Sequence, residues 1–226
     1  APFAAVSGTH RRSVATFRMT WLRLGADDRI YFFGQMNPCP LDTSKNACYG
    51  IYRVEANDTV TFVAGSLTGN TTSPADGGSA ASLVVGSFAV LPATGTNPDR
   101  VFVAYGALWC TSNDPTALIY EVMSNGKLKS TGGFGGYGLG PYLPSMNALP
   151  KSTELCSHQI QFFDPDAPIR AIAPRIDSLS IGDASKVDVV DDGAGGFFQR
   201  AGGGPQNSNG QVVMHFTADG RSRAYA

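Results

Sequence analysis

Short apolar runs separated by Asn, Asp and Gly recur along the whole 226-residue chain. A segment that begins Ile51-Tyr52 returns at Ile119-Tyr120 and again at Val187, a step of 68 from 51 to 119 and from 119 to 187. A short segment that contains glycine follows each copy. Self-similarity at a fixed spacing is typical of repeat architectures. The pattern therefore predicts three copies of one structural unit, with third strands that begin at Ile51, Ile119 and Val187.

Each unit holds four short apolar runs, and no run shows a sustained helical period. Asn-Asp, Asn-Gly and Asp-Gly pairs separate the runs, and these residues tolerate the positive φ of tight hairpin turns. The first strands are predicted at residues 17–24, 88–91, 160–163 and 212–216, and the second strands at residues 29–33, 100–104, 169–172 and 221–225. Four antiparallel strands per repeat describe a blade of a β-propeller, although a β-sandwich or β-solenoid also repeats its glycines.

The second unit carries the most specific sequence. In chain order it reads Val63-Ala64-Gly65, Asp76-Gly77-Gly78-Ser79-Ala80, Phe88-Ala89-Val90, Arg100-Val101-Phe102-Val103 and Ile119-Tyr120-Glu121-Val122. This order resembles the NHL-repeat family of β-propellers, in which Val-Ala-Gly, Asp-Gly-Gly-x-Ala and two strands precede Arg-Ile-x-Val. The resemblance implies an all-β fold of four-stranded antiparallel blades.

The two ends of the sequence suggest an incomplete propeller. Residues 3–8 resemble residues 62–66 and are predicted to form a fourth strand, while the last two runs are read as the first and second strands of a further unit. Residues 1–226 are thus one propeller segment of about three and a half blades. A final strand with an unpaired edge favours pairing. We therefore expect other chains, or residues beyond Ala226, to complete the propeller.

The charge and hydropathy exclude two classes of partner. The formal net charge is -1, and no basic cluster is larger than Arg11-Arg12. The longest apolar stretch, at residues 80–91, is interrupted by Ser and Gly and is too short to span a bilayer. The sequence therefore predicts neither nucleic-acid binding nor a membrane span.

The cysteines and sequons point to secretion. No spacing of the four cysteines is typical of a metal site, so two disulfides are predicted, Cys39–Cys48 and Cys110–Cys156, with four buried free thiols as the alternative. Asn57 and Asn70 each begin an Asn-x-Thr sequon in a predicted turn or loop, where a glycan could fit. These features predict a secreted, extracellular glycoprotein.

The candidate functional residues lie in two long loops between second and third strands. Residues 35–49 and 106–117 carry Met36, Tyr49, Leu108 and Trp109 beside the cysteines, and exposed aromatic residues on a stapled loop are typical of a binding surface. Alternatively, Trp109 caps the core beneath its own loop. The sequence predicts an extracellular binding or scaffold module that engages protein or glycan through these loops, with no catalytic residue and no cofactor.

The alternative function is enzymatic. His158 and His215 lie in strands predicted to border a propeller channel, where two histidines from different blades could hold a metal for a lyase or hydrolase. No carboxylate partner or ligand spacing supports that site, and a rim or packed histidine is the simpler interpretation.

Overall fold

The fold is given by a computed structural model, which describes residues 4–5, 12–13, 17–39, 41–55, 59–69, 74–105, 118–135, 138–152, 160–166, 171–176, 189–201 and 212–225. Within these ranges the chain is all-β, with antiparallel strands and two short 3₁₀ turns, η1 (Ala26–Asp28) and η2 (Pro144–Met146). No helix among the described residues is long and apolar enough to cross a membrane.

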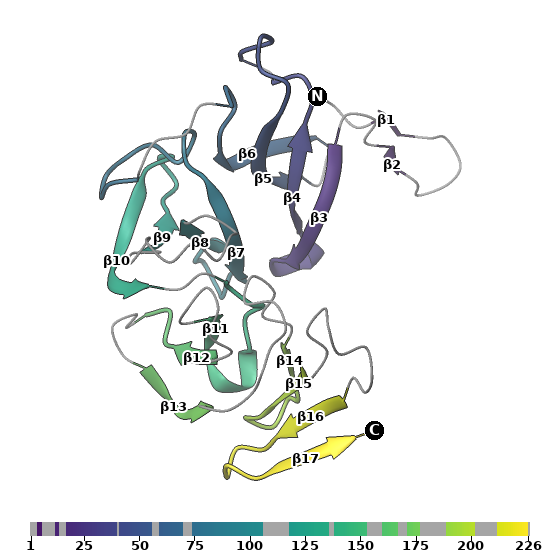
Figure 1. The fold of residues 1–226 in the computed structure, drawn as a ribbon, viewed down its shortest axis with the longest axis vertical. Helices are drawn as coiled ribbons and strands as arrows, with labels where there is room; N and C mark the ends of the chain where they lie inside the picture. Colours follow the sequence, from purple (N-terminus) through teal and green to yellow (C-terminus); the bar gives the residue numbers. More distant parts are fainter. Residues whose placement is uncertain are drawn as a thin grey trace, which may run out of the picture. The chain divides into compact units, whose positions relative to one another are not determined.

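The first large sheet is built from four consecutive strands, β3 (Phe17–Leu24), β4 (Ile30–Met36), β5 (Cys48–Val54) and β6 (Val60–Gly65). Each strand pairs antiparallel with the next one along the chain (Figure 1). Ile51 lies in β5, the third strand of this sheet, as the repeat predicts, but the strand begins earlier, at Cys48.

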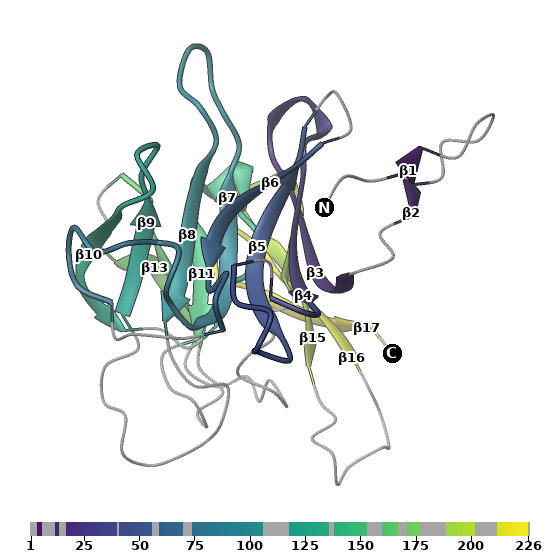
Figure 2. The same cartoon turned by 90° about the horizontal axis from the view of Figure 1, so that it is seen from above.

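The second large sheet repeats this order with β7 (Val85–Leu91), β8 (Arg100–Tyr105), β9 (Leu118–Val122) and β10 (Leu128–Gly135). Ile119 lies in its third strand, which also confirms the prediction. The hairpin turn between β7 and β8 extends beyond the ends of its strands (Figure 2).

The third sheet contains β11 (Leu149–Ser152), β12 (Ile160–Phe163) and β13 (Ala171–Ile176). The segment before β11 extends this sheet through isolated antiparallel bridges, Leu139 to Lys151 and Leu143 to Ala148. Counted with that segment, β12 is a third strand. The prediction that residues 160–163 form a first strand was therefore wrong.

The last sheet contains β14 (Val189–Asp191), β15 (Phe197–Ala201), β16 (Val212–Phe216) and β17 (Ser222–Tyr225). The strands predicted near residues 212–216 and 221–225 are confirmed, but they are third and fourth strands of a four-stranded sheet. The terminal unit therefore does not lack a third strand. Val187 lies outside the described residues, and β14, two residues later, begins this sheet instead of continuing the previous one.

The first strands of the chain are short. β1 (Ala4–Ala5) pairs with β2 (Arg12–Ser13) in a two-stranded sheet, instead of forming the fourth strand of a larger unit. Each of these strands pairs over only two residues, whereas the strands of a blade pair over longer segments.

Close Cα approaches divide the chain into two compact units. The first comprises residues 1–85, 90–101 and 121–129, and its core includes Phe32, Met36 and Tyr52 packed with Val54, Val60 and Phe62. The second comprises residues 86–89, 102–120 and 130–226. Its core includes Leu143, Ala148, Ile160, Phe162, Val189 and Phe197.

Candidate binding loop

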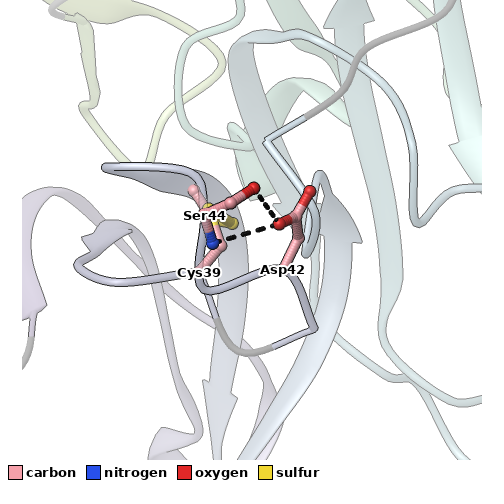
Figure 3. The surroundings of a disulfide bond; sticks show 4 residues. Cys39, Asp42 and Ser44 are labelled. Carbon is pink, nitrogen blue, oxygen red and sulfur yellow. Dashed lines mark hydrogen bonds between the residues drawn. A yellow bond between two sulfur atoms is a disulfide. The ribbon is translucent and has the colours of Figure 1, made fainter.

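A cross-linked loop joins β4 to β5 at one end of the first sheet. Polar contacts give the loop its turns: Asp42 Oδ1 accepts hydrogen bonds from the backbone N–H of Ser44, at 3.1 Å, and from the Ser44 hydroxyl (Figure 3). The Lys45 N–H donates to the Asp42 carbonyl at 3.1 Å. A short polar residue that bonds to the backbone two positions on is a common way to fix a turn. The pKa of the Asp42 carboxyl is lowered, mainly by the bond from the Ser44 hydroxyl and also by the bond from the Ser44 N–H.

The disulfide predicted between Cys39 and Cys48 closes this loop. The two Cα atoms lie 5.0 Å apart, and both cysteines are fully buried. Cys48 is the first residue of β5, so the cross-link ties the loop to the paired backbone of the sheet. Closing a loop in this way restricts its conformations before any partner arrives.

A second segment braces the same loop. The Leu41 N–H donates to the Leu67 carbonyl at 3.3 Å, and the Ser66 N–H donates to the Tyr49 carbonyl at 2.9 Å. A Cβ atom on Gly69 would lie 3.1 Å from both the Ala47 carbonyl oxygen and the Lys45 Cβ, so the two segments are in close contact. The loop is therefore held by its disulfide and by the chain that follows β6.

Two apolar side chains are exposed here, Leu41 in the loop and Tyr49 in β5, which the sequence had assigned to the loop. Leu41 is 71% exposed and Tyr49 is 49% exposed, and the Tyr49 ring stacks on Phe33 with a centroid separation of 6.1 Å. A stacked ring has fewer orientations to lose on binding, and Tyr and Leu side chains offer large contact areas. Leu41 was missed by the sequence interpretation. Its signal was an isolated apolar residue in a segment otherwise made of turn residues.

Met36 lies elsewhere than the sequence suggested. It is the last residue of β4 and is buried against the core that contains Phe32 and Tyr52. Its side chain is therefore part of the packing beneath the loop and presents no surface. The loop predicted to begin at residue 35 begins after Met36, because β4 and β5 remain paired as far as Met36 and Cys48.

The remaining predicted site residues lie outside the described residues. They are Leu108, Trp109, Cys110, Cys156, Asn57 and Asn70. The second long loop, the second disulfide and both glycosylation sites thus stay predictions.

His215 is engaged by a neighbouring carboxylate. Its Nε2 lies 2.8 Å from Asp192 Oδ2, and its ring stacks on Phe198 with centroids 4.3 Å apart. Asp192 Oδ1 accepts bonds from the backbone N–H groups of Ala194 and Gly196. The bond from His215, together with these, lowers the pKa of Asp192. Within the described ranges no group of three or more His, Cys, Asp or Glu side chains could hold a metal, and His158 lies outside those ranges.

Comparisons with known proteins identify no relative: no protein-family model matches the sequence, and no curated protein shows significant similarity to it.

Proposed function

We propose that this chain is an extracellular binding module that engages a protein ligand through the loop between β4 and β5. The observation that carries the proposal is the cross-linked, doubly braced loop, with Leu41 exposed in the loop and Tyr49 exposed in β5 at its end. Association costs conformational entropy at the interface, and a loop already fixed in one conformation loses less of it. Exposed apolar residues on such a loop are typical of interaction sites.

A protein ligand fits this surface better than a glycan. Tyr49 could stack on a sugar ring or pack against a protein, but the branched aliphatic side chain of Leu41 has no flat face for a sugar. Its favourable partner is another apolar side chain. Asp42 and Lys45, which follow Leu41 in the same loop, would supply the polar rim that surrounds the apolar centre of a protein interface.

The architecture that we propose is a β-propeller segment related to the NHL-repeat family. Its support is the run of consecutive antiparallel four-stranded sheets, with turns at Asn-Gly and Asp-Gly positions, and the Asp76-Gly77-Gly78 segment. The glycines of that segment bond to the first residue of β10: Gly77 N–H donates to the Leu128 carbonyl at 2.7 Å, and Leu128 N–H donates to the Gly78 carbonyl at 2.8 Å. The segment thus pairs with the beginning of β10, the last strand of the sheet that follows it.

The disulfide and the two sequons support the further proposal that the protein is secreted. Disulfides persist in oxidising compartments, and Asn57 and Asn70 would carry glycans there. Intact mass before and after enzymatic glycan removal, on protein from a eukaryotic secretory host, tests this part. An unchanged mass would remove the glycan argument, and a secreted yield that does not require Cys39 and Cys48 would weaken the disulfide argument.

The binding function is tested with a random peptide library displayed on phage. Peptides selected on the wild-type chain should lose about tenfold or more in affinity for the Leu41→Ser and Tyr49→Ser variants, because apolar centres dominate such interfaces. Met123→Ser changes another exposed apolar residue, which directly follows β9, and is the control. The Cys39→Ser/Cys48→Ser double variant should bind more weakly while its circular dichroism remains that of a β protein. Peptides that bind all these variants equally would overturn the proposal.

A further inference from the structure

Consecutive sheets in the described parts of each unit pack face to face. In the first unit, Tyr31 of β4 points to the loop between β7 and β8, where its hydroxyl bonds to Asp99. In the second unit, Phe163 of β12 makes an edge contact with Phe102 of β8, at 6.3 Å between ring centroids. Its neighbour Phe162 contacts Phe197 of β15 at 4.9 Å. Adjacent strand residues point to opposite faces, so the third sheet has a neighbour on each face.

We name the two faces of each sheet by the order of the sheets along the chain. The leading face packs on the sheet that comes before it in the chain, and the trailing face packs on the sheet that comes after it. Tyr31 thus lies on the trailing face of the β3–β6 sheet, and Phe197 lies on the leading face of the β14–β17 sheet. Two faces have no consecutive four-stranded sheet within the described strands: the leading face of β3–β6, which only the two-stranded β1–β2 sheet precedes in the chain, and the trailing face of β14–β17.

The trailing face of β14–β17 is exposed and largely apolar. One row crosses all four strands, because the antiparallel register pairs Val190 with Phe198, Phe198 with His215 and His215 with Arg223. A second pair, Val213 opposite Tyr225, lies on the same face. The exposed fractions are 65% for Val190, 44% for Val213 and 43% for Tyr225.

Two polar side chains on this face interact within the sheet. His215 is bonded to Asp192, and the guanidinium of Arg223 lies 5.1 Å from the centroid of the Tyr225 ring. The register also pairs Arg200 with Val213. Between these residues the face offers aliphatic side chains and ring surfaces. Such a surface fits another sheet face better than it fits a small polar ligand.

The leading face of β3–β6 is apolar at the end nearest η1. Leu22 pairs with Phe32 and Leu24 pairs with Ile30, which puts all four on one face. Leu22 is 58% exposed, Leu24 60% and Ile30 40%, whereas Phe32 and Tyr52 farther along the same face are buried. The accessible part of this face is thus a compact aliphatic patch at the first two strands.

These two faces hold most of the exposed large apolar side chains in the described part of the chain. Of nine such residues, Leu22, Leu24, Ile30, Val190, Val213 and Tyr225 lie on them; the other three are Leu41, Tyr49 and Met123. Contiguous apolar patches of this kind mark interaction surfaces. The same chain therefore carries one exposed leading patch and one exposed trailing patch, each of the type that sheets elsewhere in the chain pack together.

We propose that a second copy of this chain occupies these faces head to tail, with the trailing face of β14–β17 in one copy packed on the leading face of β3–β6 in the other. The contact continues the rule by which the internal sheets pack, trailing face on leading face, across a molecular boundary. Because the two patches differ, the interface is heterologous: two copies close a ring if the rotation permits, and otherwise more copies join. This assembly is independent of the ligand that the β4–β5 loop would bind.

The test is sedimentation velocity of the full chain over a wide concentration range, with three single variants. Leu24→Asp disables the leading patch, and Val190→Asp disables the trailing patch. Met123→Asp makes the same kind of change at an exposed apolar residue that lies on neither face. We expect the wild type and Met123→Asp to associate as concentration rises. Leu24→Asp alone and Val190→Asp alone should remain monomers at concentrations at least about tenfold higher, because a buried charge at an apolar contact is strongly unfavourable.

Mixing the two disabled variants gives the decisive measurement. The intact trailing patch of Leu24→Asp can still meet the intact leading patch of Val190→Asp, so an equimolar mixture should form a one-to-one complex of twice the monomer mass. A mixture that stays monomeric, or an association that only one of the two variants disrupts, overturns the head-to-tail contact. A wild type that remains monomeric at every concentration overturns it without any variant.

Discussion

The hydroxyl of Tyr31 donates a 2.8 Å hydrogen bond to Oδ2 of Asp99, which lies 68 residues later in the chain. Tyr31 belongs to β4, and Asp99 directly precedes β8, so the bond joins one sheet to the turn that follows β7 in the next. The other carboxylate oxygen accepts the backbone N–H groups of Ala93, at 2.7 Å, and Ala26, at 3.0 Å. One carboxylate thus fixes two turns and a strand.

The surroundings of Asp99 leave almost no space. Its side chain is 1% exposed, and a Cβ atom on Gly25 would lie only 2.3 Å from Asp99 Oδ2. Burial by itself raises the pKa of this carboxyl, but the bonds from Ala26, Ala93 and Tyr31, with the charge of Arg29, lower it overall. A buried carboxylate is tolerated here because donors surround it on every side that the structure describes.

Replacing Tyr31 with Phe should destabilise the fold. The substitution removes one donor from a buried charged acceptor, and hydrogen bonds to charged groups contribute about 1.5–3 kcal/mol. We expect the free energy of unfolding in urea to fall by that amount at neutral pH. Tyr225→Phe, which removes a hydroxyl from an exposed residue, is the control and should change stability by less than about 0.5 kcal/mol. Equal effects of the two variants would show that Asp99 does not depend on Tyr31.

Asp99 should make the fold sensitive to acid. Because the pKa of Asp99 is lower in the folded chain than its ordinary value of 3.8, the unfolded chain binds more protons in that range. The stabilisation is complete above the unfolded pKa and is lost as pH falls through the folded pKa. We expect the free energy of unfolding, measured between about pH 2 and pH 6, to fall on the acid side of this range.

Asp99→Asn is the variant that isolates this acid dependence. It keeps the size of the side chain but cannot ionise, so its stability should be lower at neutral pH and should change less steeply with acid. An unchanged slope in Asp99→Asn would assign the acid dependence to other carboxyl groups.

The first two sheets and one disulfide could be predicted from the sequence because their signals are local. Alternating apolar runs and Asn-Gly or Asp-Gly turns locate strands, and the nine-residue spacing of Cys39 and Cys48 suits closure of a single loop. The third and fourth sheets were assigned the wrong strands. An apolar strand such as Ile160–Phe163 has the same pattern whether it is first or third in a sheet. The 68-residue spacing of the repeat also stops predicting strand positions where the connecting loops differ in length.

One feature of the fold lacked a visible signal. The segment that bridges to Lys151 of β11 through Leu139 contains Gly138, Gly140 and Pro141, residues that favour turns over strands. Met36, by contrast, had a signal that was not used: it lies four residues after Phe32, so alternation along a strand puts both on one face. Burial on that face follows from the core around Tyr52.

Gln199 should be replaceable by an apolar residue with a gain in stability. It lies in β15 and is 1% exposed, and neither its amide oxygen nor its amide nitrogen has a hydrogen-bond partner among the residues that the structure describes. A buried polar group without a partner costs about 1–3 kcal/mol. We expect Gln199→Met, which has a similar length, to raise the urea midpoint by a comparable free energy. Gln199→Glu should lower it, because a carboxylate at this position is harder to bury. A destabilised Gln199→Met would reveal that the amide is bonded in solution.

Lys151 should make stability rise with pH in the alkaline range. It lies in β11 and is 2% exposed, and burial lowers its pKa from 10.5 to about 8. Between these two values the unfolded chain holds a proton that the folded chain has released. The free energy of unfolding therefore increases with pH from about 8 towards 10.5, whereas below about pH 8 both states are protonated and the cost of burying the charge is constant.

Lys151→Met separates this effect from the titration of other groups. The variant keeps an unbranched apolar stem of similar length but carries no charge. Its free energy of unfolding should therefore change little with pH over the range in which the wild type becomes more stable. The full shift corresponds to at most about 3 kcal/mol. We expect the variant to be more stable than the wild type at neutral pH and the two curves to converge as pH rises.

Unfolding in urea should be compared from about pH 7 to pH 9.5. This range lies below the ordinary pKa of 10.0 for Tyr31 and Tyr52, whose burial raises their pKa values to about 12, so the titration of these tyrosines contributes little. Parallel curves for wild type and variant would mean that Lys151 is protonated in the folded chain throughout this range.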